Sequence, residues 1–514
     1  MNPIPFIEET GDSLLHGVPA KIYITQKIVA TASPFLPIPI HMRIKIACAG
    51  FVLRLAEIII GTEILVKNEL REFFFIDARI RSLLLRLARK KIIMSWDRVP
   101  QYPDSPPIIH YRIKLGAIAL PSGERVHISG SQGSGTGGTK NEALMLATAE
   151  ALERYSTAVW GSKNIVRGSY VNLAGKGAID PRQFSFFSDN QLKNGNFSKS
   201  LISETKEIGW VSARSILDKD AKYLIPAQLA YLFYENVEPN DCHFMGVSTS
   251  GVAAHSSYNR AAYRALCEVI ERDALMIFWL NKLVPPRIEL KSITIPKVRE
   301  CIKSLQEYGF ELHITDITTD FNMPAFCAVL IDRRGGVAVS ISATADYDVG
   351  KALERLMLEI MKFAHIERVK SSDDVVIDEK QFKLVCSFND RARLWSNPKM
   401  IEKINFFVSG GEKNFSEVIK KHVSSDTESL LGLVEAVFRE KNYQCYLVDV
   451  TSMDAKEEGL VVVRAVSPDL VPVYFDEKER PCGVKRLYTA PVTMKYREAP
   501  TTEDGLNQIP HPFM

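Results

Sequence analysis

The sequence contains the same cluster of charged residues twice. Residues 149–160 read AEALERYSTAVW and residues 267–279 read CEVIERDALMIFW, so each has a Glu-x-x-Glu-Arg motif followed by an apolar run that ends in Trp. On a helix, side chains at positions i, i+3 and i+4 share one face. Each motif therefore predicts two carboxylates and one guanidinium in a single cluster. The members are Glu150, Glu153 and Arg154 in the first copy and Glu268, Glu271 and Arg272 in the second.

Such a cluster has two chemical interpretations. A single one is most often a surface ion pair that contributes a fraction of a kcal/mol. Here the flanking residues are largely apolar, which predicts two well-packed helices, and carboxylates in such surroundings need a cation, either Arg or a metal. Oxygen ligands favour Mg²⁺, which commonly binds through a few carboxylates together with substrate phosphates. Two such helices facing each other would form a Mg-ATP site without a Walker loop.

A glycine-rich stretch, GSQGSGTGGTK at residues 130–140, precedes the first motif. Gly133 and Gly138 have the spacing of a Walker A loop, but Thr139 and Lys140 follow in the reverse of the required order. From the glycines alone, a flexible linker is the simpler interpretation. Their position just before the first charged helix favours instead a segment whose backbone approaches a phosphate.

Composition indicates an ordinary globular protein. The chain has 514 residues, of which 46% are hydrophobic and 24% charged, enough for one large domain and a smaller one, or for two to three domains. The net charge of +3 gives no reason to expect a nucleic acid or an anionic membrane as a partner. Eight cysteines without a Cys-x-x-Cys motif argue against a disulfide framework or a zinc site and favour a cytoplasmic location.

The beginning of the chain shows no targeting pattern. It lacks the basic start and apolar core of a secretion signal. The most apolar stretch, residues 44–65, carries Lys45, Arg54, Glu57 and Glu63. Charges this frequent are costly in hydrocarbon, so the stretch predicts a buried helix pair rather than a membrane span.

Prolines suggest a boundary at VPQYPDSPP, residues 99–107. We therefore expect a mainly helical accessory region at residues 1–100 and a main domain at 101–514. The accessory region ends in ARIRSLLLRLARKK, residues 78–91, with leucines at helical spacing and basic residues between them. This helix either docks an acidic partner or packs, with a solvated face, on the protein's own core, and the second is simpler because basic amphipathic helices are common. From residue 108 onward, strand-like runs such as MPAFCAVLIDRRGGVAVSISA (323–343) alternate with helical patterns, which favours an α+β or mixed α/β body.

Several segments, in order, resemble the YcaO superfamily. Residues 135–156, GTGGTKNEALMLATAEALERYS, are similar to its first ATP-binding segment, and residues 249–275, TSGVAAHSSYNRAAYRALCEVIERDAL, to its second. VDVTSMD (448–454), GLVVVRAVSPDLVPVYF (459–475) and the terminal NQIPHPFM resemble segments of the branch that forms thiazole and oxazole rings in ribosomal peptides. The resemblance covers roughly residues 108–514. It implies an α+β fold whose YcaO-type core mixes helices and strands (mixed α/β), with an ATP site between helices.

The activity that the resemblance implies is that of a cyclodehydratase D subunit. In that chemistry a Cys, Ser or Thr side chain of a precursor peptide attacks the preceding backbone carbonyl, and the oxygen is phosphorylated by ATP. Loss of phosphate then leaves a thiazoline or oxazoline ring, as in bacteriocin maturation. The implied partners are the precursor peptide, an E1-like or ocin-type protein that binds its leader, and a flavin dehydrogenase in the same complex. A homodimer is compatible with this picture.

The resemblance also carries roles over to particular residues. The metal ligands for Mg²⁺ would be the carboxylates, and the arginines and three small residues would contact ATP. The metal set is Glu150, Glu153, Glu268 and Glu271, and the nucleotide set adds Arg154, Arg272, Gly135, Gly137 and Ser256.

The carboxyl end is expected to take part in catalysis. Pro510 and Pro512 match the proline-rich end of the ring-forming branch, and alternate prolines favour an extended tail with little freedom to lose on docking. A disordered end is the usual alternative. The resemblance implies that the tail threads back beside the ATP site, where the carboxylate of Met514 would accept a proton or orient the reacting amide.

Four positions depart from the family pattern and leave alternatives open. Thr136 stands where Lys is frequent, Leu146 where Ser is usual, Ser256 where Asn is frequent, and Arg260 where Glu is frequent. An Arg in place of a metal-facing carboxylate would weaken a Mg²⁺ site unless it contacts phosphate. One alternative is therefore a nucleotide-impaired scaffold subunit of a modification complex. Another keeps the ATP chemistry but makes a thioamide or an amidine, and the proline-rich end argues against it.

Overall fold

The computed structural model describes residues 76–101, 103–120, 123–126, 132–161, 164–194, 202–246, 248–334, 337–364, 379–419 and 426–513. These residues belong to one compact unit, which begins at residue 63. The accessory region was predicted for residues 1–100; its residues 1–75, with the helix pair predicted at 44–65, lie outside the described ranges, as does Met514. Within the described ranges, no helix is both long and apolar enough to cross a membrane. The cysteines that these ranges contain are free thiols.

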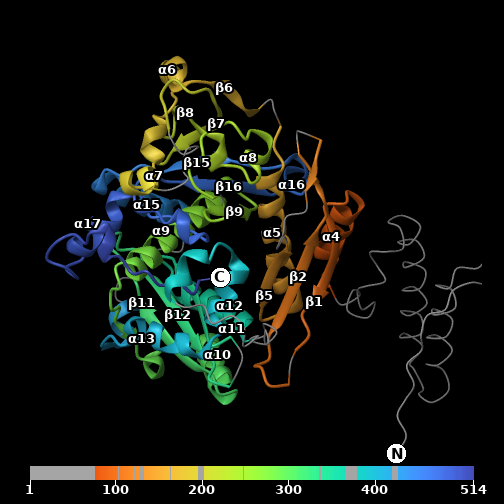
Figure 1. The fold of residues 1–514 in the computed structure, drawn as a ribbon. Coiled ribbons are helices and arrows are strands. Elements are labelled where there is room, and N and C mark those ends of the chain that lie inside the picture. Colours follow the sequence, from red (N-terminus) through yellow and green to blue (C-terminus); the bar gives the residue numbers. More distant parts are fainter. Residues whose placement is uncertain are drawn as a thin grey trace, which may run out of the picture. The chain divides into compact units, whose positions relative to one another are not determined.

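A three-stranded antiparallel sheet forms one side of this unit. Its order is β1 (Ile93–Arg98), β2 (Ile109–Leu115) and β5 (Gln132–Gly137), with α5 (Lys140–Ala158) packed against β5 (Figure 1). The boundary predicted near residue 100 therefore falls inside a sheet, because Trp96 of β1 pairs with Ile113 of β2 across it. The prolines of residues 99–107 connect two paired strands and do not separate two domains.

The basic segment at 78–91 forms helix α4 (Ala78–Arg89), as predicted. Its leucines are buried, and two of its basic residues pair with the acidic helix α16 (Met453–Glu457) and the residue after it. Arg86 lies 2.6 Å from Glu458, and Lys90 lies 3.0 Å from Asp454. The simpler interpretation, a helix that packs on the protein's own core, is confirmed.

A six-stranded antiparallel sheet lies next to α5. Its order is β6 (Val166–Gly168), β7 (Ile208–Ser215), β15 (Tyr446–Asp449), β16 (Val461–Val466) and β9 (Val252–His255), and β8 (Lys222–Pro226) pairs with β7. A five-stranded sheet has the order β13 (Val339–Ala345), β12 (Ala325–Ile331), β11 (Glu311–Asp316), β10 (Arg287–Ile288) and β14 (Glu412–Lys413). Strands β12 and β13 confirm the strand-like run at 323–343. Helices α10 (Pro296–Glu307) and α11 (Val349–Phe363) pack against this sheet.

Helix α9 (Tyr258–Leu280) joins the two larger sheets. It packs against β16 and β9 of one and against β13 of the other (Figure 1). A helix buried from several sides must be apolar on most of its surface. This explains why 15 of its 23 residues are buried, and why the motif that it carries sits among apolar neighbours.

The remaining elements are short, apart from the 15-residue helix α15. The helices are α6 (Tyr170–Leu173), α7 (Asp189–Asn194), α8 (Tyr234–Val237), α12 (Phe388–Trp395), α13 (Ile401–Val408), α14 (Phe415–Ile419), α15 (Thr427–Lys441) and α17 (Lys485–Thr493). Strands β3 (Ile118–Ala119) and β4 (Arg125–Val126) form a hairpin. The predicted mixed helix-and-sheet body is confirmed.

Candidate functional site

Both Glu-x-x-Glu-Arg motifs lie on helices, as their spacing predicted. The first belongs to α5, whose N-terminus is capped by the side chain of Thr139, and the second belongs to α9. Both helices pack against strand β9. The short strand therefore brings together two motifs that are more than a hundred residues apart in the sequence.

Main-chain amides hold three of the four glutamates. Glu153 accepts a hydrogen bond from the backbone N of Ala254 on β9 at 2.7 Å, and Glu268 accepts one from the backbone of Gly251, just before the same strand. Glu150 accepts from the backbone N of Ser134 on β5 at 2.7 Å. The carboxylates are thus fixed by two strands as well as by their own helices.

Each motif arginine pairs with glutamates of its own helix. Arg154 lies 2.7 Å from Glu150, and Arg272 lies 2.9 Å from Glu268 and also pairs with Glu271. The side chains of Glu271 and Arg272 are only 12% and 15% exposed, so the second cluster is not an ordinary surface ion pair.

Burial raises the pKa of two glutamates of the cluster. Burial raises the pKa of Glu153 to about 8, and the nearby charges of Glu150 and Glu268 add to this effect against the hydrogen bond from Ala254. Burial likewise raises the pKa of Glu271 to about 7, although Arg272 opposes it. Carboxyl groups that hold protons near neutral pH beside two arginines mark a place where a further cation would be stabilised.

Two arginines offer unused hydrogen-bond donors at this place. The Nε atoms of Arg272 and of Arg464 on β16 are buried and have no hydrogen-bond partner among the described residues. Arg464 is 7% exposed, and its Nη1 donates to the carbonyl of Ser248 at 2.8 Å. Burial lowers its pKa to about 10, against the charge of Glu268. Guanidinium donors left open in this way fit the oxygens of a phosphate.

The same two arginines line one pocket. Its wall also includes Ser248, Ser250 and the apolar segment 470–473, whose Val471 N donates to the buried Asp273 at 2.9 Å. Sequence reasoning missed Arg464. The signal that could have found it is a single charged residue in the apolar strand VVVRAV.

The donor set suits Mg²⁺ when phosphates complete it. In the described part of the chain, no three His, Cys, Asp or Glu side chains gather closely enough to hold a metal by themselves. Mg²⁺ in nucleotide sites is usually bound by one or two carboxylates together with substrate phosphates and water. The pairs Glu150 with Glu153 and Glu268 with Glu271 supply carboxylates in that number.

Residues 132–137 of the glycine-rich stretch form strand β5, so the flexible linker, which the glycines alone suggested as the alternative, is wrong. Gly133, Gly135 and Gly137 alternate along β5 and face α5. A Cβ on Gly135 would lie 2.1 Å from the carbonyl O of Ala143, closer than any atom tolerates. The absent side chains therefore allow close packing between strand and helix. A contact of Gly135 or Gly137 with a nucleotide stays a prediction.

Of the residues that depart from the family pattern, three are exposed, and the fourth, Thr136, is buried and uncharged. Ser256 is exposed, and its hydrogen bonds among the described residues are with His255, not with the glutamates. Arg260 is exposed in the first turn of α9, and Leu146 is 47% exposed on α5. Thr136 is buried, and its hydroxyl has no partner within the described ranges.

The carboxyl end threads back into the core, as predicted. The indole N of Trp279 donates to the carbonyl of Ile509 at 2.8 Å, and that of Trp395 to the carbonyl of Pro510 at 3.0 Å. The ring centre of Phe513 lies 4.2 Å from the guanidinium carbon of Arg272. Figure 1 shows this end beside α12, the helix that carries Trp395. The tail thus reaches the charged cluster, and the catalytic roles of Pro510, Pro512 and Met514 stay predictions.

Solved structures show the same fold. The chain is similar to a heterocyclase in complex with substrate and cofactor, at 21% identity and a TM-score of 0.69, over 85% of this chain and 57% of that one. It is also similar to the heterocyclase TruD, at 22% identity and a TM-score of 0.57, over 72% of this chain and 50% of that one. A third is YcaO from Methanopyrus kandleri bound with AMPPCP and Mg²⁺, at 17% identity and a TM-score of 0.56, over 79% of this chain and 94% of that one. The chain spans little more than half the length of the two heterocyclases.

Sequence comparison gives the family. An uncharacterized protein of Methanothermobacter thermautotrophicus is 23% identical over 375 residues, which are 71% of this chain and 89% of that protein. A family model described as "YcaO cyclodehydratase, ATP-ad Mg2+-binding" matches residues 134–471, the range that holds both motifs, β9 and Arg464. The chain belongs to the YcaO cyclodehydratase family.

Proposed function

We propose that this protein is an ATP-dependent peptide cyclodehydratase that converts Cys, Ser or Thr residues of a ribosomal precursor peptide into thiazoline or oxazoline rings. The observation that carries the proposal is the meeting of the two charged helices at β9. There, burial raises the pKa of Glu153 and Glu271, which indicates that a further cation would stabilise their carboxylates. Close by, the Nε atoms of Arg272 and Arg464 have no hydrogen-bond partner among the described residues.

The acidic and the basic residues of the site would have different roles. Glu150, Glu153, Glu268 and Glu271 would hold Mg²⁺, while Arg154, Arg272 and Arg464 would bind the phosphates. ATP, when bound, would supply the phosphoryl group that turns the amide oxygen into a leaving group, and Mg²⁺ and the arginines would offset the charge of that group. Overall, the peptide side chain bonds to the carbonyl carbon, the oxygen leaves as phosphate, and ADP remains.

The carboxyl end would serve the proton transfers. The side chain that attacks must lose its proton, as must the amide nitrogen that becomes part of the ring. A carboxylate at Met514, one residue beyond Phe513, would accept such a proton or orient the amide. The position of Phe513 beside Arg272 supports this role.

Partners complete the proposal. Of the similar structures, one is described as a heterocyclase with substrate and cofactor, and another as bound with AMPPCP and Mg²⁺. By analogy we propose that this chain acts on a precursor peptide with a leader-binding partner protein, and that a flavin dehydrogenase oxidises the rings in the same complex.

Binding of Mg-ATP is the direct test. We expect calorimetry to detect a complex of the protein with Mg²⁺ and a non-hydrolysable ATP analogue. Turnover with the precursor peptide and the leader-binding partner should then release ADP and phosphate and remove one water from the peptide per ring, as seen by mass spectrometry. Absence of nucleotide binding would favour the scaffold function that Thr136, Leu146 and Arg260 suggested. Replacement of oxygen by sulfur in the peptide, without loss of water, would favour a thioamide.

A further inference from the structure

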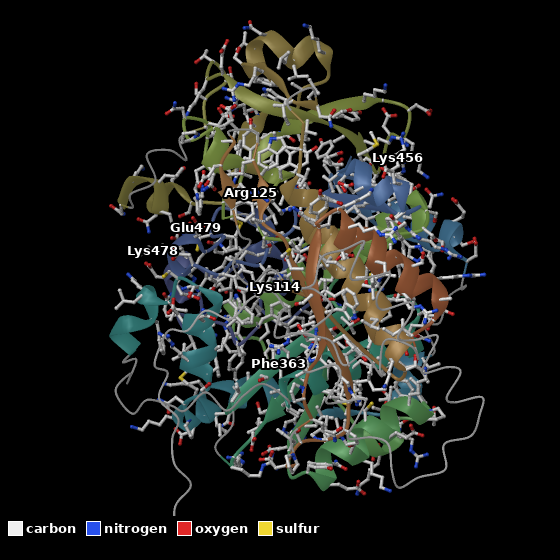
Figure 2. The ribbon with its side chains drawn as sticks, turned by 90° about the vertical axis from the view of Figure 1, so that its right-hand side faces the viewer. Lys114, Arg125, Phe363, Lys456, Lys478 and Glu479 are labelled. Atoms are coloured by element: carbon white, nitrogen blue, oxygen red, sulfur yellow. The ribbon has the colours of Figure 1, made fainter. Side chains whose placement is uncertain are left out.

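A lysine far away in the sequence lies at the edge of the glutamate cluster. Lys362 is near the end of α11, and its side chain is only 17% exposed. Its Nζ lies 3.4 Å from the hydroxyl of Ser134 on β5, and it also pairs with Glu359 one turn earlier. Figure 2 labels the next residue, Phe363, at the end of this helix. Helix α11 thus delivers an ammonium to strand β5, against which it packs.

Ser134 links this ammonium to the first motif. Its backbone N donates to Glu150 at 2.7 Å, while its hydroxyl lies within reach of Lys362. Burial lowers the pKa of Lys362, but the charges of Glu359 and Glu150 outweigh that effect and raise the pKa, even against Arg154. The lysine therefore keeps its positive charge beside the pair of Glu150 and Arg154.

We propose that Lys362 is a phosphate-binding residue of the nucleotide site. An ammonium has three donors, so it can stay on Ser134 and still contact a phosphate oxygen. Side chains two residues apart share one face of a strand, and on this face Ser134 and Thr136 are both neutral. Since neither residue can offer a positive charge to a phosphate on this face of β5, the charge comes from Lys362 of α11. The inference rests on the proposed function, because it needs nucleotide in this site.

Calorimetry with Mg²⁺ and a non-hydrolysable ATP analogue tests the inference on the full-length protein. Lys362→Gln shortens the side chain by one atom, keeps a hydrogen-bond donor toward Ser134 and removes the charge. Because a charge-assisted hydrogen bond is lost, binding should weaken about tenfold or more. Lys362→Arg keeps the charge and should bind within about threefold of wild type. The matched control is Lys351→Met, at an exposed lysine on the same helix, and it should change nothing.

Two outcomes overturn the inference. One is wild-type affinity in Lys362→Gln. The other is equal weakening in Lys362→Gln and Lys362→Arg, which would assign the effect to packing.

A variant at a second residue keeps the test valid if Lys362→Gln does not fold. Glu359→Gln removes, from a half-exposed position, the carboxylate that competes for the ammonium. It should bind at least as tightly as wild type, and weaker binding would contradict the inference. If the wild-type protein itself binds no Mg-ATP, the proposed function fails instead.

Discussion

At Glu271, burial and the charge of Arg272 act in opposite directions on the pKa of the carboxyl group. Its pKa of about 7 means that the free protein near neutral pH already holds this carboxyl partly protonated. Substitution by Gln should therefore disturb the fold little. We predict that Glu271→Gln abolishes ATP consumption, because it removes the negative charge that a metal needs while it keeps shape and hydrogen-bonding capacity.

Steady-state phosphate release and thermal unfolding would be measured together for this variant. Glu307→Gln, at an exposed glutamate on α10, serves as the control and should consume ATP normally. Wild-type turnover in Glu271→Gln would remove Glu271 from the metal site.

His243 is a residue whose charge depends on pH and whose partners adjoin the pocket. Burial opposes its protonation, but hydrogen bonds to Glu235 and Glu479 outweigh this and raise the pKa of His243 to about 9. Glu479 also accepts from the backbone N of Gly246, which lines the pocket. A raised pKa in the folded state adds stability that is full below the ordinary value of 6.5 and is lost as the pH rises through 9.

We predict that His243→Gln lowers the melting temperature at pH 6 by about 2 °C, and that the difference from wild type disappears near pH 10. Thermal unfolding measured from pH 6 to pH 10 checks this. A difference that is constant over the range would mean that the ring contributes packing, through its stacking on Phe187, and not charge.

At the scale of elements, the contact between β5 and α5 positions the first motif. Gly135 has no room for a side chain, whereas a Cβ on Gly138 would meet only the carboxylate of Glu142, at 3.6 Å. We predict that Gly135→Ala destabilises the protein by about 1–3 kcal/mol, as overpacking does, and weakens Mg-ATP binding because Glu150 is displaced.

Gly138→Ala is the matched control in the same stretch and should leave both quantities nearly unchanged. Chemical denaturation gives the stability, and calorimetry gives the affinity. Equal effects of the two substitutions would show that the stretch needs flexibility in general and not close packing at Gly135.

The same elements show what sequence reasoning could reach. The motif helices and strands β12 and β13 were predictable because their patterns are local periodicities. Strand β5 was not, because glycine is depleted in strands and the reason for it here is the approach of α5. Arg464 and Lys362 were missed for a related reason. Each is a single charged residue whose meaning depends on which distant segment it meets in the fold.

At the scale of the molecule, the residues before the predicted boundary are part of the main body. Strand β1 completes the sheet that carries β5, and helix α4 packs against β1 and α5. The prolines between β1 and β2 made this hard to predict from the sequence. The basic face of α4 offers fewer unpaired charges to an acidic partner, since Arg86 and Lys90 are engaged by Glu458 and Asp454.

The carboxyl end connects the five-stranded sheet with the charged cluster. Phe513 pairs with Ile341 of β13 and lies over Arg272 of α9, while Arg391 of α12 donates to the carbonyl of His511 at 3.0 Å. His511 is fully buried, and this burial holds its pKa well below the ordinary value, so the ring is neutral. Up to Phe513, the tail is held by several elements of the body, and this supports the role proposed for Met514, the next residue in the sequence.

We predict that a few residues added after Met514 reduce ring formation by about 100-fold, because a small displacement of a reacting group costs that much. The contacts of Ile509, Pro510 and Phe513 remain in this variant, so the melting temperature and the affinity for Mg-ATP should change little. The same residues added before Met1 form the control. Peptide cyclisation is followed by mass spectrometry beside calorimetry and thermal unfolding. Normal cyclisation by the extended protein would make the tail a structural strap across α9, whereas equal losses of cyclisation and nucleotide affinity would place its function in the support of Arg272.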